Sequence, residues 1–323
     1  MDRLARYSWG VLLYNLGVIL WGAYVRATGS GAGCGSHWPL CNGEVVPRGA
    51  GLETIVEYSH RLTSGIALIS VIVLWIWTRR VAPEGHPVRG AAAASVAFMI
   101  SEALLGAGLV LFELVAGNTS LLRAGMAAAH LLNTFALVAS MTLMAWWASG
   151  GPAVDWRAHR GTAGQVVLNG ALILLVSAAG AVTALGDTLF PSATLAEGIN
   201  ADVAAGSHIL VRLRTIHPVL ALASAFALMT AAWRMGREAQ DPRANTLARG
   251  LIAVLCVQLA AGLANVFLLA PVWLQMVHLL LADTLWILFV LLSAAAMAVS
   301  SAPAPAARTV PYASRHASAT SAR

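Results

Sequence analysis

The chain has 323 residues, of which 59% are hydrophobic and only 11% are charged. A typical soluble domain is about 25% charged, so this composition excludes an ordinary soluble protein and indicates an integral membrane protein in a lipid bilayer. The formal net charge is +6, and every basic residue is an arginine. The absence of lysine excludes lysine Schiff-base chemistry. The arginines are spread over short loops, so we do not expect nucleic-acid binding.

Eight apolar segments are long enough to cross a membrane, whose hydrocarbon core of about 30 Å needs roughly 20 residues. They cover residues 8–28, 59–78, 90–113, 126–148, 163–186, 215–235, 247–270 and 276–300. The predicted fold class is therefore all-α integral membrane, with eight transmembrane helices.

The arginines between these segments predict the orientation, because cytoplasmic loops carry an excess of basic residues. With a cytoplasmic N-terminus, fourteen arginines lie inside and only six lie outside. The outer six are Arg26, Arg48, Arg61, Arg123, Arg212 and Arg214. We therefore expect a protein of the cell (inner) membrane, with both termini in the cytoplasm and the loops 29–57 and 187–214 on the outer face. Residues 301–323 are small, basic and proline-containing, which predicts a disordered cytoplasmic tail.

The second half of the chain echoes the first at an offset of about 157 residues. In chain order, "GAYVRATG" resembles "GAVTALG", "EYSHRLTSGIAL" resembles "RTIHPVLALASA", "SEALLGAGL" resembles "VQLAAGLAN", and "AAHLLNTFALV" resembles "MVHLLLADTLWIL". A repeat of four helices with the same orientation predicts two pseudo-symmetric four-helix bundles in parallel. The N-terminal bundle would occupy residues 1–150 and the C-terminal bundle residues 151–300.

The repeat places one histidine within a few residues of the outer start of every second segment. These histidines are His60, His130, His217 and His278. A single one could simply hydrogen-bond a neighbour at the membrane interface. Ionisable side chains within spans are rare and usually functional, however, and four at equivalent positions favour a shared role, with two imidazoles in each bundle.

Two imidazoles between facing helices suit haem iron better than a bare metal ion. Zinc needs three or four ligands close together, and neither bundle adds a cysteine to its pair. Haem needs axial ligands and an apolar slot for its ring. Small residues at Gly106, Gly108 and Gly262 would let helices approach such a flat group closely. The sequence therefore predicts two bis-histidine haem sites.

The two halves differ beside their first histidine. Glu57 lies one helical turn before His60 and Arg61 follows it, whereas Arg214 and Pro218 stand at these places in the second half. An arginine near haem can pair with a propionate, and a carboxylate can relay protons or stabilise a developing cation. The first half is therefore the predicted reactive site. Glu57 could instead be a helix-terminal charge favoured by the dipole, or the partner of Arg61 in a salt bridge.

The segment "TGSGAGCGSHWPLCNGEVVP" at residues 28–47 is rich in glycine and polar residues and is predicted to be a loop. It carries Cys34 and Cys41, which would face the oxidising outer side, where a disulfide is permitted. A structural clip and a redox-active pair are both open at this point. Cys256 lies within an apolar segment and is predicted to be a small core residue.

Several of these motifs together resemble the haem A synthase family. They are "GAYVRATGSGAGC", "WPLCNG" and "EYSHRLTSG", followed by "AHLLN", "IHP" and "VHLLLAD", and the resemblance covers roughly residues 8–300. It implies an eight-helix protein of two four-helix bundles. It also implies an oxidoreductase of haem A biosynthesis, which converts a ring methyl of haem O to a formyl group by two successive oxidations and so supplies the cofactor of cytochrome oxidase.

The resemblance also implies roles for individual residues. Glu57 would be the catalytically important acid, and Cys34 and Cys41 would form a disulfide with a redox role. Four histidines would bind haem iron: His60 and His130 the substrate haem O, and His217 and His278 a haem B cofactor. Some relatives carry a second cysteine pair between their fifth and sixth helices, which this chain lacks, so a scheme with two disulfides is not supported.

Two other classes of protein account for part of the pattern. A di-haem b-type electron-transfer subunit explains four histidines, but neither the acid in only one half nor the cysteine loop. A transporter explains an internal repeat, but transporter repeats are often inverted and their polar residues gather at midplane. As partners, we expect haem O synthase and an unidentified electron-transfer protein.

Overall fold

The computed structural model describes residues 1–299, so the predicted tail at 301–323 lies outside the described part of the chain. Within residues 1–299 there are only helices and connecting loops, with no β-strand. The elements are α1 (Asp2–Ala27), η1 (Ser30–Ala32), α2 (Leu52–Val81), α3 (Pro87–Leu111), α4 (Leu121–Ala148), α5 (Arg160–Leu189), α6 (Leu195–Val203), α7 (Ile209–Arg212), η2 (Leu213–Thr215), α8 (Ile216–Glu238), α9 (Arg243–Phe267) and α10 (Val272–Ala296).

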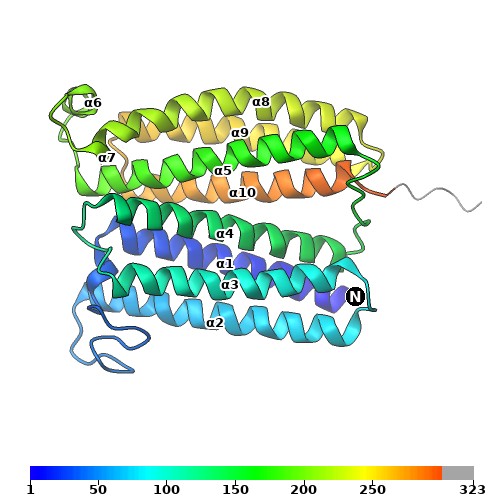
Figure 1. Cartoon of the computed structure of the whole chain (residues 1–323), viewed down its shortest axis with the longest axis horizontal. Helices are drawn as coiled ribbons and strands as arrows, with labels where there is room; N and C mark the ends of the chain where they lie inside the picture. The colour runs from blue at the N-terminus through cyan, green and yellow to red at the C-terminus, as the bar shows by residue number, and fades with distance from the viewer. Residues whose placement is uncertain (300–323) are drawn as a thin grey trace, which may run out of the picture.

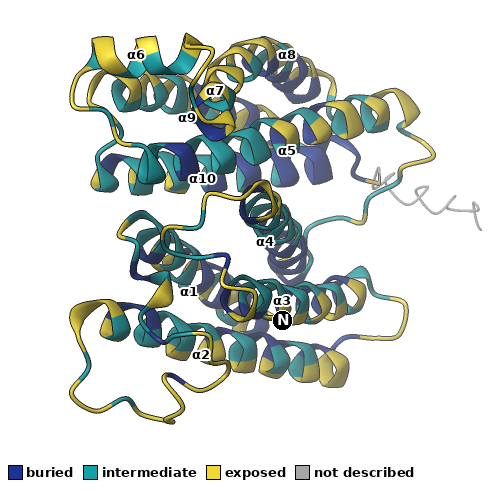
Figure 2. Cartoon of the chain, turned by 60° about the vertical axis from the view of Figure 1, so that its left-hand side comes forward, coloured by how far each residue is buried: buried dark blue, intermediate teal, exposed yellow. Residues whose placement is uncertain are grey.

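Eight helices are long and apolar enough to cross a membrane, which confirms the predicted all-α class and the eight spans. Seven are single elements, and the sixth span, Ile209–Glu238, combines α7, η2 and α8. Large apolar side chains face outward from these helices, among them Leu13 (66% exposed), Ile69 (63%) and Phe226 (74%). In Figure 2 such exposed positions lie along the outer faces of the helices. This is the surface that a lipid environment requires.

The helices gather in two groups along the chain. Figure 1 shows α1–α4 in the lower half of the molecule and α5, α8, α9 and α10 in the upper half. The long loop after α1 and the segment containing α6 lie at one end, and the N-terminus lies at the other. The division into two domains near residue 150 and the pseudo-symmetry of the two bundles stay predictions.

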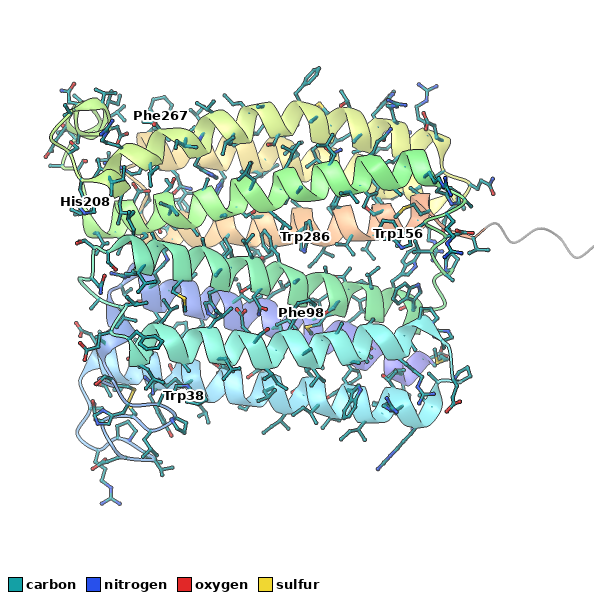
Figure 3. The ribbon with its side chains drawn as sticks, in the orientation of Figure 1. Trp38, Phe98, Trp156, His208, Phe267 and Trp286 are labelled. Atoms are coloured by element: carbon teal, nitrogen blue, oxygen red, sulfur yellow. A yellow bond between two sulfur atoms is a disulfide. The ribbon has the colours of Figure 1, made fainter. Side chains whose placement is uncertain are left out.

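The two groups meet where α4 packs against α10. Phe135 and Trp286 stack there, with ring centroids 5.6 Å apart, and Trp286 Nε1 donates a hydrogen bond of 2.7 Å to the carbonyl oxygen of Phe135. Figure 3 shows Trp286 at this boundary. Buried apolar residues from both groups form one continuous core. The groups are therefore packed against each other as one body.

Arg26 provides a polar link between the same groups. From the end of α1, its Nη1 donates to the carbonyl oxygen of Ala184 (2.8 Å) and to the hydroxyl of Thr188 (3.0 Å). Its Nη2 donates to the side-chain oxygen of Gln275 at 2.9 Å. One side chain from α1 thus contacts both α5 and α10.

We expect an Arg26→Met substitution to lower the free energy of unfolding by about 2 kcal/mol, since hydrogen bonds between membrane helices average about 0.6 kcal/mol and reach about 1.7. The measurement is thermal unfolding in detergent. Arg6→Met, at an exposed position of the same helix, is the matched control and should change stability little. Equal stability of the two variants would show that the Arg26 contacts do not hold the helix groups together.

Candidate functional site

Two of the four histidines, His60 and His130, lie deeper in their helices than the sequence predicted. The prediction placed each within a few residues of a helix start, yet His60 comes eight residues after Leu52 and His130 nine after Leu121. At about 1.5 Å per residue, this is some 12 Å along the axis. The prediction was wrong for these two because hydropathy omits the first turns of their helices. His278 comes six residues after Val272, and His217 is the second residue of α8, eight residues after the start of the sixth span at Ile209.

Each of these imidazoles packs against a glycine on a neighbouring helix. A Cβ built on that glycine would lie 2.8 to 3.8 Å from the Cε1 atom of the ring. The pairs are Gly22 with His60 (2.8 Å), Gly106 with His130 (3.8 Å), Gly180 with His217 (3.0 Å) and Gly262 with His278 (3.2 Å). The pairs occur in the same order in both halves. The sequence analysis did not predict these contacts between glycine and histidine, although the aligned "GAYVRATG" and "GAVTALG" contain Gly22 and Gly180. The predicted approach of Gly106, Gly108 and Gly262 to a flat group stays a prediction.

The C-terminal pair of histidines faces each other directly. The ring centroids of His217 and His278 are 6.4 Å apart and their planes are nearly perpendicular, at 87°. Nδ1 of His217 lies 3.0 Å from the carbonyl oxygen of Val176. Donation from Nδ1 to a carbonyl fixes the imidazole tautomer and leaves Nε2 free as a metal ligand. The geometry therefore fits two axial ligands of one iron.

The N-terminal histidines, His60 on α2 and His130 on α4, are also partly buried, and each packs against a glycine. The Nδ1 atoms of His60, His130 and His278 are buried without a hydrogen-bond partner, and buried polar atoms left in this way point to a missing ligand or partner. No group of three or more His, Cys, Asp or Glu in residues 1–299 could hold a bare metal ion. Paired imidazoles against glycines fit a flat macrocycle with a central iron instead.

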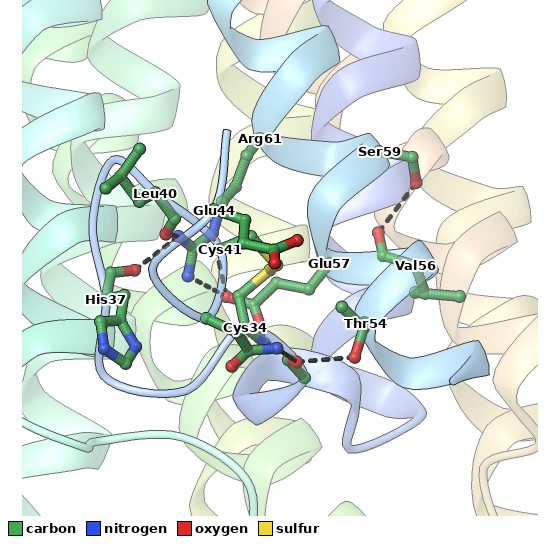
Figure 4. The surroundings of a disulfide bond; sticks show 12 residues. Cys34, His37, Leu40, Cys41, Glu44, Thr54, Val56, Glu57, Ser59 and Arg61 are labelled. Carbon is green, nitrogen blue, oxygen red and sulfur yellow. Dashed lines mark hydrogen bonds and ion pairs between the residues drawn. A yellow bond between two sulfur atoms is a disulfide. The ribbon is translucent and has the colours of Figure 1, made fainter. Parts of the chain in front are cut away.

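Glu57 is buried, with only 3% of its surface exposed, and it connects α2 to the cysteine loop. Its Oε2 accepts a hydrogen bond of 2.8 Å from the backbone N–H of Cys34. Its Oε1 accepts from Nε (3.1 Å) and Nη2 (2.5 Å) of Arg61. Figure 4 shows the carboxylate between the disulfide loop and the guanidinium. A buried carboxylate needs such partners, and it lies one turn from His60.

The structure decides between the alternatives raised for Glu57. The acid in the first turn of α2 is Glu53, so Glu57 is not a helix-terminal charge. The salt bridge to Arg61 is present. Nη1 of Arg61 also donates to the carbonyl oxygens of His37 (2.6 Å) and Leu40 (2.8 Å). Arg61 is thus engaged in holding the loop, and its pairing with a haem propionate stays a prediction.

In the second half of the chain, a basic side chain connects a loop segment to the helices in a comparable way. Arg214, which aligns with Glu57, forms ion pairs with Asp187 (3.1 Å) at the end of α5 and with Asp202 (2.9 Å) in α6. Both aligned positions therefore fasten a connecting segment to the helices. Only in the first half is the fastening group an acid.

The predicted disulfide is present. The sulfur atoms of Cys34 and Cys41 are bonded, and both residues are buried. Cys256 was expected in the core, but it is exposed on α9. The cysteine side chain is small and apolar enough to face either lipid or the protein core. The sequence around Cys256 therefore did not distinguish an exposed position from a buried one.

Comparison with known proteins agrees with these features. A family described as "COX15-CtaA: Cytochrome oxidase assembly protein" matches residues 5–54 and 50–290. The chain belongs to this family. Relatives named "Heme A synthase" include one from Alkalihalophilus pseudofirmus, 44% identical over 110 residues (34% of this chain, 37% of the relative). Another, from Halalkalibacterium halodurans, is 47% identical over 95 residues (29% and 32%). The resemblance to haem A synthase is confirmed.

A longer match comes from a protein with a different name. "Protoheme IX farnesyltransferase" of Thermus thermophilus is 49% identical over 297 residues, which is 92% of this chain and 49% of that protein. The chain thus spans about half the length of this relative. The COX15-CtaA match covers nearly the same part of the chain.

The structure also shows polar residues within the helices that the sequence analysis missed. Glu102 of α3 lies beside His130, and Gln258 of α9 lies beside His278. Asp283 of α10 is fully buried and neither carboxylate oxygen has a hydrogen-bond partner. Acidic residues within apolar spans are themselves a signal of function, and the alignment of "SEALLGAGL" with "VQLAAGLAN" already placed Glu102 over Gln258.

We expect removal of the disulfide by a double Cys34→Ser and Cys41→Ser substitution to lower the free energy of unfolding by about 2 kcal/mol, as loop-closure entropy implies for a short loop. Thermal unfolding in detergent measures this. Cys256→Ser, at an exposed position, should have no comparable effect. A double variant as stable as the parent would show that the contacts of Glu57 and Arg61 hold the loop without the disulfide.

Proposed function

We propose that the protein is a haem A synthase, which oxidises a ring methyl of haem O to the formyl group of haem A. The observation that carries the proposal is the buried acid Glu57 one turn before His60. The aligned position in the second half holds a basic residue. Two histidine pairs with an acid beside only one of them suit one reactive haem and one electron-carrying haem. The named relatives support the same assignment.

In the proposed reaction, His60 and His130 bind the substrate haem O between α2 and α4 and present its ring methyl to the outer end of the bundle. The methyl carbon is first hydroxylated and then oxidised again to a hydrated aldehyde, which loses water to give the formyl group. With water as the oxygen source, each step consumes one water molecule and releases two protons and two electrons. The four electrons pass to the electron-transfer protein expected as a partner. Glu57 would take a proton or stabilise positive charge that develops at the methyl, which is the role open to a positioned carboxylate.

The C-terminal pair would hold the cofactor. His217 and His278 would hold haem B, with the carbonyl of Val176 orienting the ring of His217. When bound there, haem B supplies one-electron redox chemistry. The polar contacts of Arg26 and the packing of Trp286 keep this half fixed against the substrate half.

We further propose the surroundings in which the enzyme works. The spans and the arginine distribution support the cell membrane, with the cysteine loop on the outer face and both termini in the cytoplasm. The Thermus relatives are named for farnesyl transfer to protohaem IX and match this chain over half their length. Haem O carries such a farnesyl group, so a haem O synthase is the proposed partner that supplies the substrate.

The test is to extract haems from membranes of cells that make haem O, with and without this protein, and to identify them by chromatography and mass. Haem A or its hydroxylated precursor should appear only when the protein is present. Recovery of haem B with unchanged haem O would overturn the proposal.

That result would favour the electron-transfer subunit instead. One observation is in its favour: Glu57 is already fully engaged by Cys34 and Arg61, as expected of a purely structural acid. The presence or absence of the oxidised haems decides between the two functions.

A further inference from the structure

Glu102 is a carboxylate inside the membrane-spanning helix α3, and its contacts come from donors on α4. Nδ2 of Asn133 donates to its Oε2 at 2.6 Å, and the hydroxyl of Thr134 donates to its Oε1. Asn133 is itself fixed, because its Nδ2 also donates to the carbonyl oxygen of Phe98 and its Oδ1 accepts from Ser101. Both oxygens of the Glu102 carboxylate therefore accept hydrogen bonds from α4.

The same carboxylate lies beside one of the proposed iron ligands. Oε1 of Glu102 is 3.4 Å from Nδ1 of His130, within ion-pair range, although the present orientation does not form a hydrogen bond. Nδ1 has no other partner. If Nε2 of His130 binds iron, Nδ1 is the remaining donor, and Glu102 is the acceptor next to it.

The aligned position in the other half also lies beside its histidine, but it carries no charge and contacts the other ring nitrogen. Gln258 aligns with Glu102, and its Nε2 lies 3.3 Å from Nε2 of His278. The glycines that face the two histidines, Gly106 and Gly262, come four residues later in each helix. The two sites therefore match in backbone and differ at this position in two respects: a carboxylate beside Nδ1 of the histidine in the first, and a neutral amide beside Nε2 in the second.

We propose that Glu102 is a positioning residue that acts through His130 and gives the N-terminal haem a lower reduction potential than the haem held by His217 and His278. A carboxylate that accepts a hydrogen bond from a ligand imidazole orients the ring and raises its basicity. A more basic ligand stabilises the ferric form, and hydrogen bonding around the iron is one of the ways in which a protein sets haem potential. Gln258, without charge, gives no such stabilisation.

This inference rests on the proposed function, since it assumes a haem in each half. Its consequence is a direction for electron flow. Electrons that leave the substrate haem move toward the haem of higher potential in the C-terminal half. A purely structural Glu102, which only fastens α3 to α4, would affect stability and leave both potentials where they are.

The experiment is a spectroscopic redox titration of the purified protein from cells that make haem O. It compares the parent, Glu102→Gln and the reciprocal variant Gln258→Glu. His130→Ala and His278→Ala assign each component to one site by its loss. Glu102→Gln should raise the potential of the N-terminal haem only, and Gln258→Glu should lower that of the C-terminal haem only. Glu113→Gln, an exposed acid after the end of α3, is the control and should shift neither.

Unchanged potentials in Glu102→Gln and Gln258→Glu, with normal haem content, would overturn the inference and leave the proposed function intact. If Glu102→Gln fails to retain haem, the Gln258→Glu variant decides by itself, because it adds the carboxylate to the other site. A parent protein with no bound haem would overturn the proposed function, and this inference with it.

Discussion

Replacement of Glu57 by glutamine should lower the conversion of haem O to haem A by about 10²- to 10⁴-fold, the usual contribution of a positioned acid or base. The carboxylate is buried beside His60 and its aligned partner is basic, so no second acid stands at that place in the other half. Haem B should be retained, since His217 and His278 are untouched. The measurement is the ratio of haem A to haem O in extracted membranes.

Two comparisons separate chemistry from structure in this variant. Glutamine keeps one oxygen that can accept from the N–H of Cys34, but its amide NH2 then faces the donors of Arg61. The unfolding temperature should therefore fall through loss of the Arg61 ion pair, and retention of haem B shows whether the fold persists. Glu53→Gln changes an exposed acid in the first turn of the same helix and should leave conversion unchanged. If the Glu57→Gln variant converts haem O to haem A as fully as the parent, Glu57 has only a structural role, as the partner of Arg61 and of the cysteine loop.

The sequence was most informative where one physical property dominates. Long apolar runs predicted eight spans because the bilayer demands length and apolarity at once, and the cysteine pair was evident from its shared loop. Helix starts were not predictable in this way. Residues 52–58 belong to α2, but their polar side chains bind the cysteine loop instead of lipid, so hydropathy assigned most of them to the loop.

The contacts of the site depended on partners distant in the sequence. From the sequence, Arg61 is a plausible partner for a haem propionate. The structure shows instead that its N–H groups donate to Glu57 and to loop carbonyls. Glu102 was overlooked because its relation to His130 arises from packing of α3 on α4. Single ionisable groups in apolar helices are therefore the residues that sequence analysis of such proteins should examine first.

Replacement of Gly22 by alanine should displace His60 and lower haem occupancy of the N-terminal site by about 10- to 100-fold, as found when the support of a metal ligand is disturbed. The new Cβ would lie 2.8 Å from Cε1 and 3.0 Å from Nε2 of the imidazole, closer than carbon atoms pack. The ring is the end of a side chain and can move, so the fold should survive while the ligand is lost. Low-spin haem per protein, with the unfolding temperature alongside, measures both effects.

Alanine substitutions at other glycines extend this test to a series of contact distances. Gly17→Ala adds the same methyl group to the same helix, where nothing lies within 4 Å, and should leave haem binding unchanged. Gly180→Ala and Gly262→Ala, at 3.0 and 3.2 Å, should reduce haem at the C-terminal site, whereas Gly106→Ala, at 3.8 Å, is an ordinary contact and should have little effect. Loss of haem that does not follow these distances would contradict the assignment, because a glycine selected for contact with a ligand must matter most where that contact is closest.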